Sequence, residues 1–232
     1  MEKKYQDKEL GTITIRASEK ATRYILKVKN GEVIATMPYQ GNEKTLWDFL
    51  EQNRNKLLKQ ISQQPKQRWD ESTVLQTNTF SLHIFCTDRK NFYLSLKEGI
   101  LHIACPLHTD FSQNSVQILL NSFLERTLRY EAKRILPARL MALAQQYNFT
   151  VNGIKIQNSK SRWGSCSTRK IINLSLHLML LPPHLIDYVL LHELCHTVEM
   201  NHSMRFWKLM DQVTHNQSHQ LREELKNFSP LI

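Results

Sequence analysis

Two histidines stand four residues apart, at His192 and His196, and a third, His202, follows six residues later. On a helix, positions i and i+4 project from one face about a turn apart, so two imidazoles can reach a single tetrahedral zinc ion. A catalytic zinc has three protein ligands and one open position, which makes His202 the expected third ligand. Glu193 stands beside the first histidine, where it can take a proton from zinc-bound water. We therefore expect one Zn²⁺ per chain.

The segment around these histidines has the composition of a buried helix. From Pro183 to Met200 it is apolar almost all round. Its polar residues form one narrow stripe: Tyr188, His192, His196 and Glu199. Buried polar groups are costly without partners, and a metal ion supplies one. The alternative is a set of structural histidines that are satisfied by hydrogen bonds. Glu199 is either a rival ligand or a partner that orients a metal-bound histidine.

The first 110 residues are predicted to be rich in strands. Residue alternation predicts strands at 12–16, 24–28 and 33–37, with Asn30-Gly31 as a hairpin turn. A helix is expected from about Glu43 to Gln63. Three more short strands are expected at 81–86, 91–96 and 100–105. The N-terminal part, residues 1–110, is therefore predicted as a β-rich subdomain with one helix.

The second part, residues 111–232, is predicted as the domain that carries the histidine helix. A long helical segment is expected from Phe111 to Tyr147, kinked or broken near Pro137. A strand is expected at Ile171–Leu180, and Pro182-Pro183 then begins the histidine helix. A further helix is expected from Ser203 to about His215, before a short polar segment at the end. The expected fold class is α+β.

Composition limits the classes of function. The first ten residues have no apolar core of a signal peptide and no apolar run reaches membrane-spanning length, so we expect a cytoplasmic protein without a membrane partner. The net charge is +10, but basic residues are spread along the chain without a long basic run. That distribution favours weak contact with polyanions and identifies no specific nucleic-acid site. The oligomeric state is not predicted.

Five ordered blocks of sequence resemble one known family. They are Arg162-Trp163-Gly164-Ser165-Cys166-Ser167, Ile172-Asn173-Leu174-Ser175-Leu176, Pro182-Pro183 to Asp187-Tyr188-Val189, His192-Glu193-Leu194-Cys195-His196, and Asn201-His202-Ser203 with Phe206-Trp207. Together they resemble the YgjP-like metallopeptidase family, which is related to the SprT/Spartan proteases and the compact gluzincins. The resemblance extends over most of the chain, including the strand-rich N-terminal part.

The resemblance implies a zincin-like fold with zinc on His192, His196 and His202 and with Glu193 as general base. It also implies that a sheet edge above the metal helix holds an extended peptide by main-chain pairing, and the strand Ile171–Leu180 resembles that sheet segment. The sequence departs from the family at two positions. The family commonly has a large residue where Ser175 stands and a proline where Met204 stands. Both departures affect the expected substrate groove rather than the chemistry.

The function expected from these observations is a zinc metallopeptidase acting on peptides or unfolded proteins. Glu193 takes a proton from the water and passes it to the leaving amine, and the residues weighed for stabilising the oxyanion are Arg162, Tyr188, His177 and Arg205. Three alternatives stay open. They are a DNA-associated SprT-like protease module, a structural zinc protein with a fourth ligand, and a metal-dependent hydrolase of a non-peptide substrate.

Overall fold

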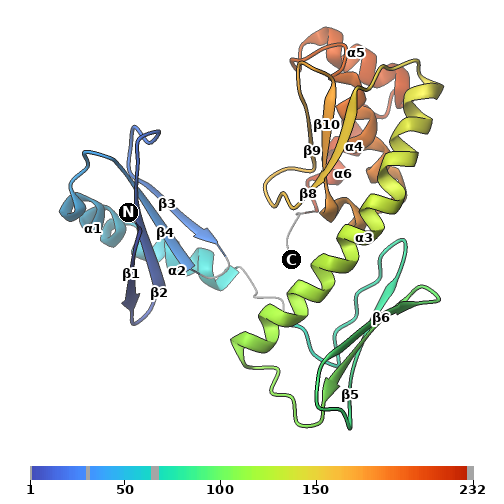
Figure 1. Ribbon diagram of the computed structural model, residues 1–232. Helices are drawn as coiled ribbons and strands as arrows, with labels where there is room; N and C mark the ends of the chain where they lie inside the picture. The colour runs from blue at the N-terminus through green and yellow to red at the C-terminus, as the bar shows by residue number, and fades with distance from the viewer. Residues whose placement is uncertain (1, 30–31, 64–67, 229–232) are drawn as a thin grey trace. The chain divides into compact units, whose positions relative to one another are not determined.

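The protein is described by a computed structural model that covers residues 2–29, 32–63 and 68–228. It divides into two compact units, Met1–Gln67 and Arg68–Ile232 (Figure 1). The sequence predicted a boundary near residue 110 instead. The difference arises because the strands at 81–106 share one apolar core with the helices and strands after them. The α+β class with a β-rich N-terminal part is confirmed.

Within the described residues, the N-terminal unit has four strands and two helices. They are β1 (Glu2–Asp7), β2 (Gly11–Ser18), β3 (Ile25–Lys29), β4 (Glu32–Pro38), α1 (Glu43–Gln52) and α2 (Arg54–Gln63). The strand order is β1-β2-β4-β3, with β2 and β4 parallel and the other pairs antiparallel. The predicted pairing of β3 with β4 is confirmed, while the turn residues Asn30 and Gly31 lie outside the described residues.

The single helix expected between residues 43 and 63 is two helices. The chain breaks at Asn53, whose N–H donates to the carbonyl of Leu50 at 3.0 Å and whose side-chain amide donates to the carbonyl of Phe49 at 2.8 Å. These bonds satisfy carbonyls at the end of α1. The apolar faces of both helices and of the sheet meet in a separate small core: Leu10, Ile13, Ile15, Val33, Ala35, Leu46, Leu50 and Leu57.

The second unit begins with a small sheet that packs on a long helix. The sheet consists of β5 (Ser81–Thr87), β6 (Tyr93–Lys97) and β7 (Ile100–Pro106), in the order β5-β7-β6. The helix, α3 (Asn114–Gln146), continues through Pro137, so the predicted break is not found. Figure 1 shows α3 running past two sheets. The buried residues of α3 belong to the same apolar core as those of both sheets, so α3 connects the two sheets of this unit.

The second sheet of this unit lies next to the predicted metal helix. It consists of β8 (Gly153–Gln157), β9 (Gly164–Cys166) and β10 (Ile171–Ser175), in the order β8-β10-β9. The strand predicted at Ile171–Leu180 is therefore too long, and it lies at the centre of the sheet rather than at an edge. After Ser175, whose Oγ accepts a hydrogen bond from the N–H of His177 at 3.3 Å, the chain turns into a 3₁₀ helix, η1 (Leu176–Leu180).

Three helices complete the unit: α4 (Pro183–Cys195), α5 (Met204–Val213) and α6 (Ser218–Leu225). α4 is the predicted histidine helix, and it contacts β9, α3, α5 and α6. α6 lies in the segment that the sequence predicted only as a polar end. None of the helices in the described part of the chain is long and apolar enough to cross a membrane.

Candidate metal centre

Helix α4 carries the first two histidines at its C-terminal end. The helix begins at Pro182 and Pro183, where proline is tolerated because the first N–H groups of a helix have no intrahelical partner. Side chains on most of its circumference are buried, so its position in the core is fixed. His192 lies in the last turn, and His196 is the C-cap with φ −67° and ψ −14°. Helical spacing therefore extends through His196, and both imidazoles lie on the same side.

His202 approaches the same point from the turn before α5. Ser203 caps α5, because its Oγ accepts a hydrogen bond from the N–H of Phe206. The Nε2 atom of His192 lies 3.2 Å from Nε2 of His196 and 3.0 Å from Nε2 of His202. Potential ligand atoms of the three residues all lie within 4.8 Å of one another. The structure thus brings together the three histidines that the sequence singled out.

Phe206 supports the three imidazoles from the first turn of α5. Its side chain is fully buried, and its ring centroid lies 4.9, 4.6 and 4.8 Å from those of His192, His196 and His202. An aromatic ring shared by all three side chains restricts their rotamers and excludes water from their inner side. The sequence indicated only a core residue at this position.

The nitrogen geometry fits a tetrahedral metal ion. Two nitrogens bound to zinc at about 2.0–2.1 Å lie about 3.3 Å apart in a tetrahedron, close to the separations found here. His196 Nδ1 lies 3.0 Å from the carbonyl oxygen of Glu199, which can only accept. A neutral His196 therefore carries its proton on Nδ1 and offers the Nε2 lone pair to a metal. Burial lowers the pKa of His196 and lowers that of His192 to about 3, so both are neutral at physiological pH.

Glu193 is a buried carboxyl group next to the first histidine. Its exposed fraction is 5%, and its Oε2 atom has no hydrogen-bond partner among the residues that the structure describes. Burial raises the pKa of Glu193 to about 8, while the charge of Arg162 acts in the opposite direction. A carboxyl group with a free oxygen and a raised pKa has the properties of a group that exchanges protons with a substrate or a water molecule.

The other residues weighed from the sequence have different surroundings. The carboxylate of Glu199 does not join the histidine group, and this residue contributes its main-chain carbonyl instead. His177 is buried and does not join the group, and its Nε2 lies 2.8 Å from Oδ1 of Asn158. Tyr188 is buried with its ring centroid 6.2 Å from that of His192, and Arg205 is exposed. Of the residues weighed for the oxyanion, Tyr188 thus has a ring contact with His192, while the exposed Arg162 acts on Glu193 through its charge.

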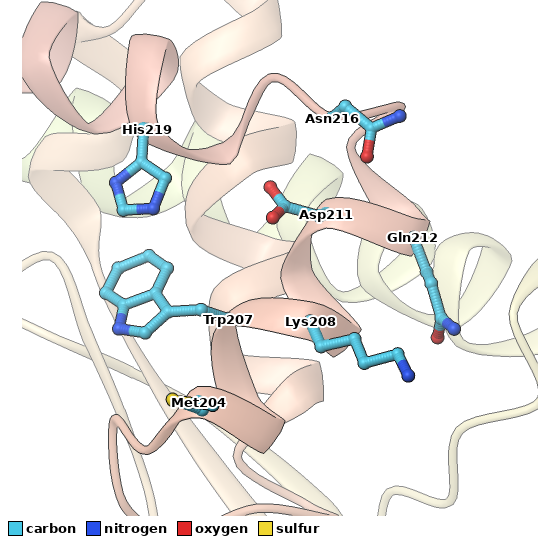
Figure 2. A pocket seen from close by; sticks show the side chains of 7 residues that line it. All are labelled: Met204, Trp207, Lys208, Asp211, Gln212, Asn216 and His219. Carbon is cyan, nitrogen blue, oxygen red and sulfur yellow. The ribbon is translucent and has the colours of Figure 1, made fainter.

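A pocket of about 600 Å³ is lined by residues of α5, α6 and the turn between them. Figure 2 shows its lining residues: Met204, Trp207, Lys208, Asp211, Gln212, Asn216 and His219. Trp207 joins the pocket to the group, because its ring stacks on His202 at 6.0 Å and on His219 at 5.1 Å. Met204 is 88% exposed, so an apolar surface lies at the mouth of the pocket.

Comparison with known protein families agrees with this geometry. The model of the family described as "YgjP-like, metallopeptidase domain" matches residues 22–228, which is most of the chain. The chain belongs to this family. It is therefore a metallopeptidase-family hydrolase, and the family implies a divalent metal ion that the histidine group could bind.

Two further comparisons add little to this assignment. The chain resembles the solved structure of the metallopeptidase zymogen of Pyrococcus abyssi abylysin, with 18% identity and a TM-score of 0.37. The match covers 40% of this chain and 93% of the other. A search of curated proteins finds no match. The assignment therefore rests on the family match.

Proposed function

We propose that the chain is a zinc-dependent peptidase, in which His192, His196 and His202 bind one zinc ion and Glu193 is the general base. The observation that carries this proposal is the convergence of three imidazole nitrogens beside a buried carboxyl group. Nε2 of His192 lies 3.2 Å from Nε2 of His196 and 3.0 Å from Nε2 of His202. Glu193, which follows His192 in the chain, is buried and has a free oxygen. Three imidazole ligands favour zinc among the metals that proteins commonly bind to nitrogen, although copper, nickel and iron share this preference.

The number of ligands supports a catalytic rather than a structural ion. Structural zinc sites are closed by four protein ligands, whereas catalytic sites have three and keep one position for water or substrate. In the part of the chain that the structure describes, the histidine group includes no fourth His, Cys, Asp or Glu. Glu199, the fourth ligand that a structural site would need, contributes a carbonyl to His196 instead.

The residues of the chain have separate roles in the proposed reaction. A bound zinc ion would supply a Lewis acid that polarises the scissile carbonyl and makes water acidic enough to attack near neutral pH. Glu193 accepts the proton of the attacking water and delivers it to the leaving nitrogen. The Glu199 carbonyl fixes the His196 ring by accepting from Nδ1–H, and Phe206 excludes water from the inner side of the three imidazoles.

The proposed substrate is a peptide or an unfolded protein segment. β9 is an edge strand of its sheet and contacts α4, so main-chain pairing with β9 would bring an extended peptide to the metal helix. The pocket that Trp207 joins to His202 has room for a substrate side chain (Figure 2). Hydrolysis of a non-peptide substrate and association with DNA stay alternatives. Retention on DNA at low salt tests the second of these.

The test compares two glutamates of the same segment. Glu193→Gln should lower hydrolysis of unfolded protein about 10³-fold while zinc remains bound, because an amide cannot accept the proton. Glu199→Gln is the matched control, since it leaves the main-chain carbonyl on His196 in place, and its activity should stay close to that of the wild type. Equal activity of Glu193→Gln and the wild type would refute the general-base assignment.

A further inference from the structure

The segment Arg162–Ser167 contains β9 and supplies no ligand to the histidine group. β9 is held in antiparallel register with β10, where Gly164 is opposite Leu174 and Ser165 is opposite Asn173. The main chain on either side of β9 is also fixed, because the Ser175 N–H donates to the carbonyl of Trp163 at 2.8 Å and the Ser167 N–H donates to the carbonyl of Ile171 at 3.0 Å. β9 therefore presents a well-defined backbone surface to α4, which it contacts.

The side chain of Glu193 occupies the space directly above Gly164. A Cβ atom added to Gly164 would lie 2.6 Å from Oε1, 2.7 Å from Cγ and 2.8 Å from Cδ of Glu193. All three separations are shorter than real Cβ contacts allow. Gly164 does not have a positive φ, so space and not backbone conformation requires glycine at this position.

Packing rather than hydrogen bonding restrains the free end of this carboxyl group. Within the described part of the chain, Oε2 of Glu193 has no hydrogen-bond partner, and the side chain is almost fully buried. In a close-packed interior, a side chain without such bonds takes its rotamer from the surfaces around it. The bare backbone of β9 at Gly164 is one of these surfaces, since Oε1, Cγ and Cδ of Glu193 fill the space that a Cβ on Gly164 would need.

We propose that Gly164 is a positioning residue, whose missing side chain leaves room for the carboxyl group of Glu193 next to the metal centre. This inference rests on the proposed role of Glu193 and adds a function for the Arg162–Ser167 segment. β9 thus has two proposed roles. Its edge is available to a substrate strand, and its backbone at Gly164 leaves space for the side chain of Glu193, the proposed general base.

Gly164→Ala tests the proposal, with Gly153→Ala as the matched control. Both glycines lie in strands of the same sheet, but a Cβ at Gly153 would meet only the Ile171 side chain, at an ordinary 3.8 Å. Gly164→Ala should lower kcat about 100-fold, because displacing a catalytic group by about 1 Å costs that much, with KM and zinc content near those of the wild type. Gly153→Ala should change kcat by less than about twofold, since an ordinary contact displaces no catalytic group.

A second readout tests the contact independently of catalysis. Glu193→Ala removes all three atoms that a Cβ on Gly164 would meet. Gly164→Ala should therefore lower Tm in the wild-type background and leave Tm unchanged in the Glu193→Ala background, where the methyl group fills vacated space. The double variant also provides folded protein if Gly164→Ala alone does not fold, and that outcome would itself support the contact.

Three results would overturn the proposal or its basis in distinguishable ways. An equal fall of Tm in both backgrounds would show that the added methyl group does not meet Glu193, and would overturn the proposal. Wild-type kcat in Gly164→Ala would overturn it as well. Absence of hydrolysis in the wild type would instead overturn the proposed function, while the Tm cycle would still decide whether Gly164 makes room for Glu193.

Discussion

His177 provides the sharpest prediction about stability, because its imidazole is buried without a partner for a second proton. Its exposed fraction is 1%, its Nε2 lies 2.8 Å from Asn158 Oδ1, and its Nδ1 has no hydrogen-bond partner in residues 2–29, 32–63 and 68–228. Asn158 Oδ1 accepts from Nε2–H, so protonation would place a charged N–H at Nδ1 where nothing accepts it. Burial, together with the charge of Lys160, lowers the pKa of His177 to about 4 from its ordinary 6.5.

The sign and size of the effect follow from this lowered pKa. Above pH 6.5 the imidazole is neutral in both folded and unfolded chains, so its contribution to stability is fully present. As pH falls from 6.5 towards 4, the unfolded chain binds a proton that the folded chain does not, and stability is lost. At about 1.4 kcal/mol per pKa unit, the loss amounts to about 3 kcal/mol at pH 4.

The assay compares urea unfolding of two proteins between pH 7 and pH 4. The variant is His177→Gln, whose amide can still donate to Asn158 but does not titrate. A Trp47→Phe background leaves tryptophans only at 69, 163 and 207, so fluorescence reports on the Arg68–Ile232 unit. With a chelator in both samples, titration of His192 and His196 contributes equally. The unfolding free energy of His177→Gln should fall by about 3 kcal/mol less than that of the reference. Equal pH dependence in the two proteins would refute the reasoning.

Two further predictions concern an ion-paired residue in the N-terminal unit and the ring beneath the metal centre. Arg54 donates to both carboxylate oxygens of Asp7, at 3.0 and 2.9 Å, and holds the pKa of Asp7 well below its usual range. Asp7→Asn should therefore lower amide protection in β2 about tenfold at pH 7. The difference should shrink steadily as pH falls below about 4, where the unfolded carboxyl group becomes protonated while the folded one stays ionised. Unchanged protection at pH 7 would contradict this. Phe206→Leu should weaken zinc binding about tenfold in a chelator competition, because the three imidazoles lose a shared support. Wild-type affinity in that variant would show that the ring does not hold the ligands.

The helix of the metal centre was predictable because its signals are local. The spacing of His192, His196 and His202 and the apolar circumference of the segment lie within twenty residues, and the structure contains the expected helix with the three side chains together. The pairing of β3 with β4 was predictable for the same reason, since strand alternation and a turn pair are read from adjacent residues.

Other features depend on contacts that a single sequence does not reveal. Alternation of Leu176, Leu178 and Leu180 suits a strand, but the Ser175 cap turns this segment into η1. α6 is mostly polar and has few buried side chains, so the sequence shows no apolar periodicity that would predict a helix there. The approach of Gly164 to Glu193 joins residues that are far apart in sequence, and it follows only from the packing of β9 on α4. The glycine within Arg162–Ser167 was the only sequence signal of that approach.

The most direct test of the account is the metal content of the untagged protein, measured by elemental analysis beside His202→Ala. His202 is exposed, so its removal should leave the fold intact. We expect one zinc per chain in the wild type and loss of tight zinc binding in the variant. Zinc that stays fully bound in His202→Ala, or a wild type that binds none after zinc is added, would contradict the three-histidine centre.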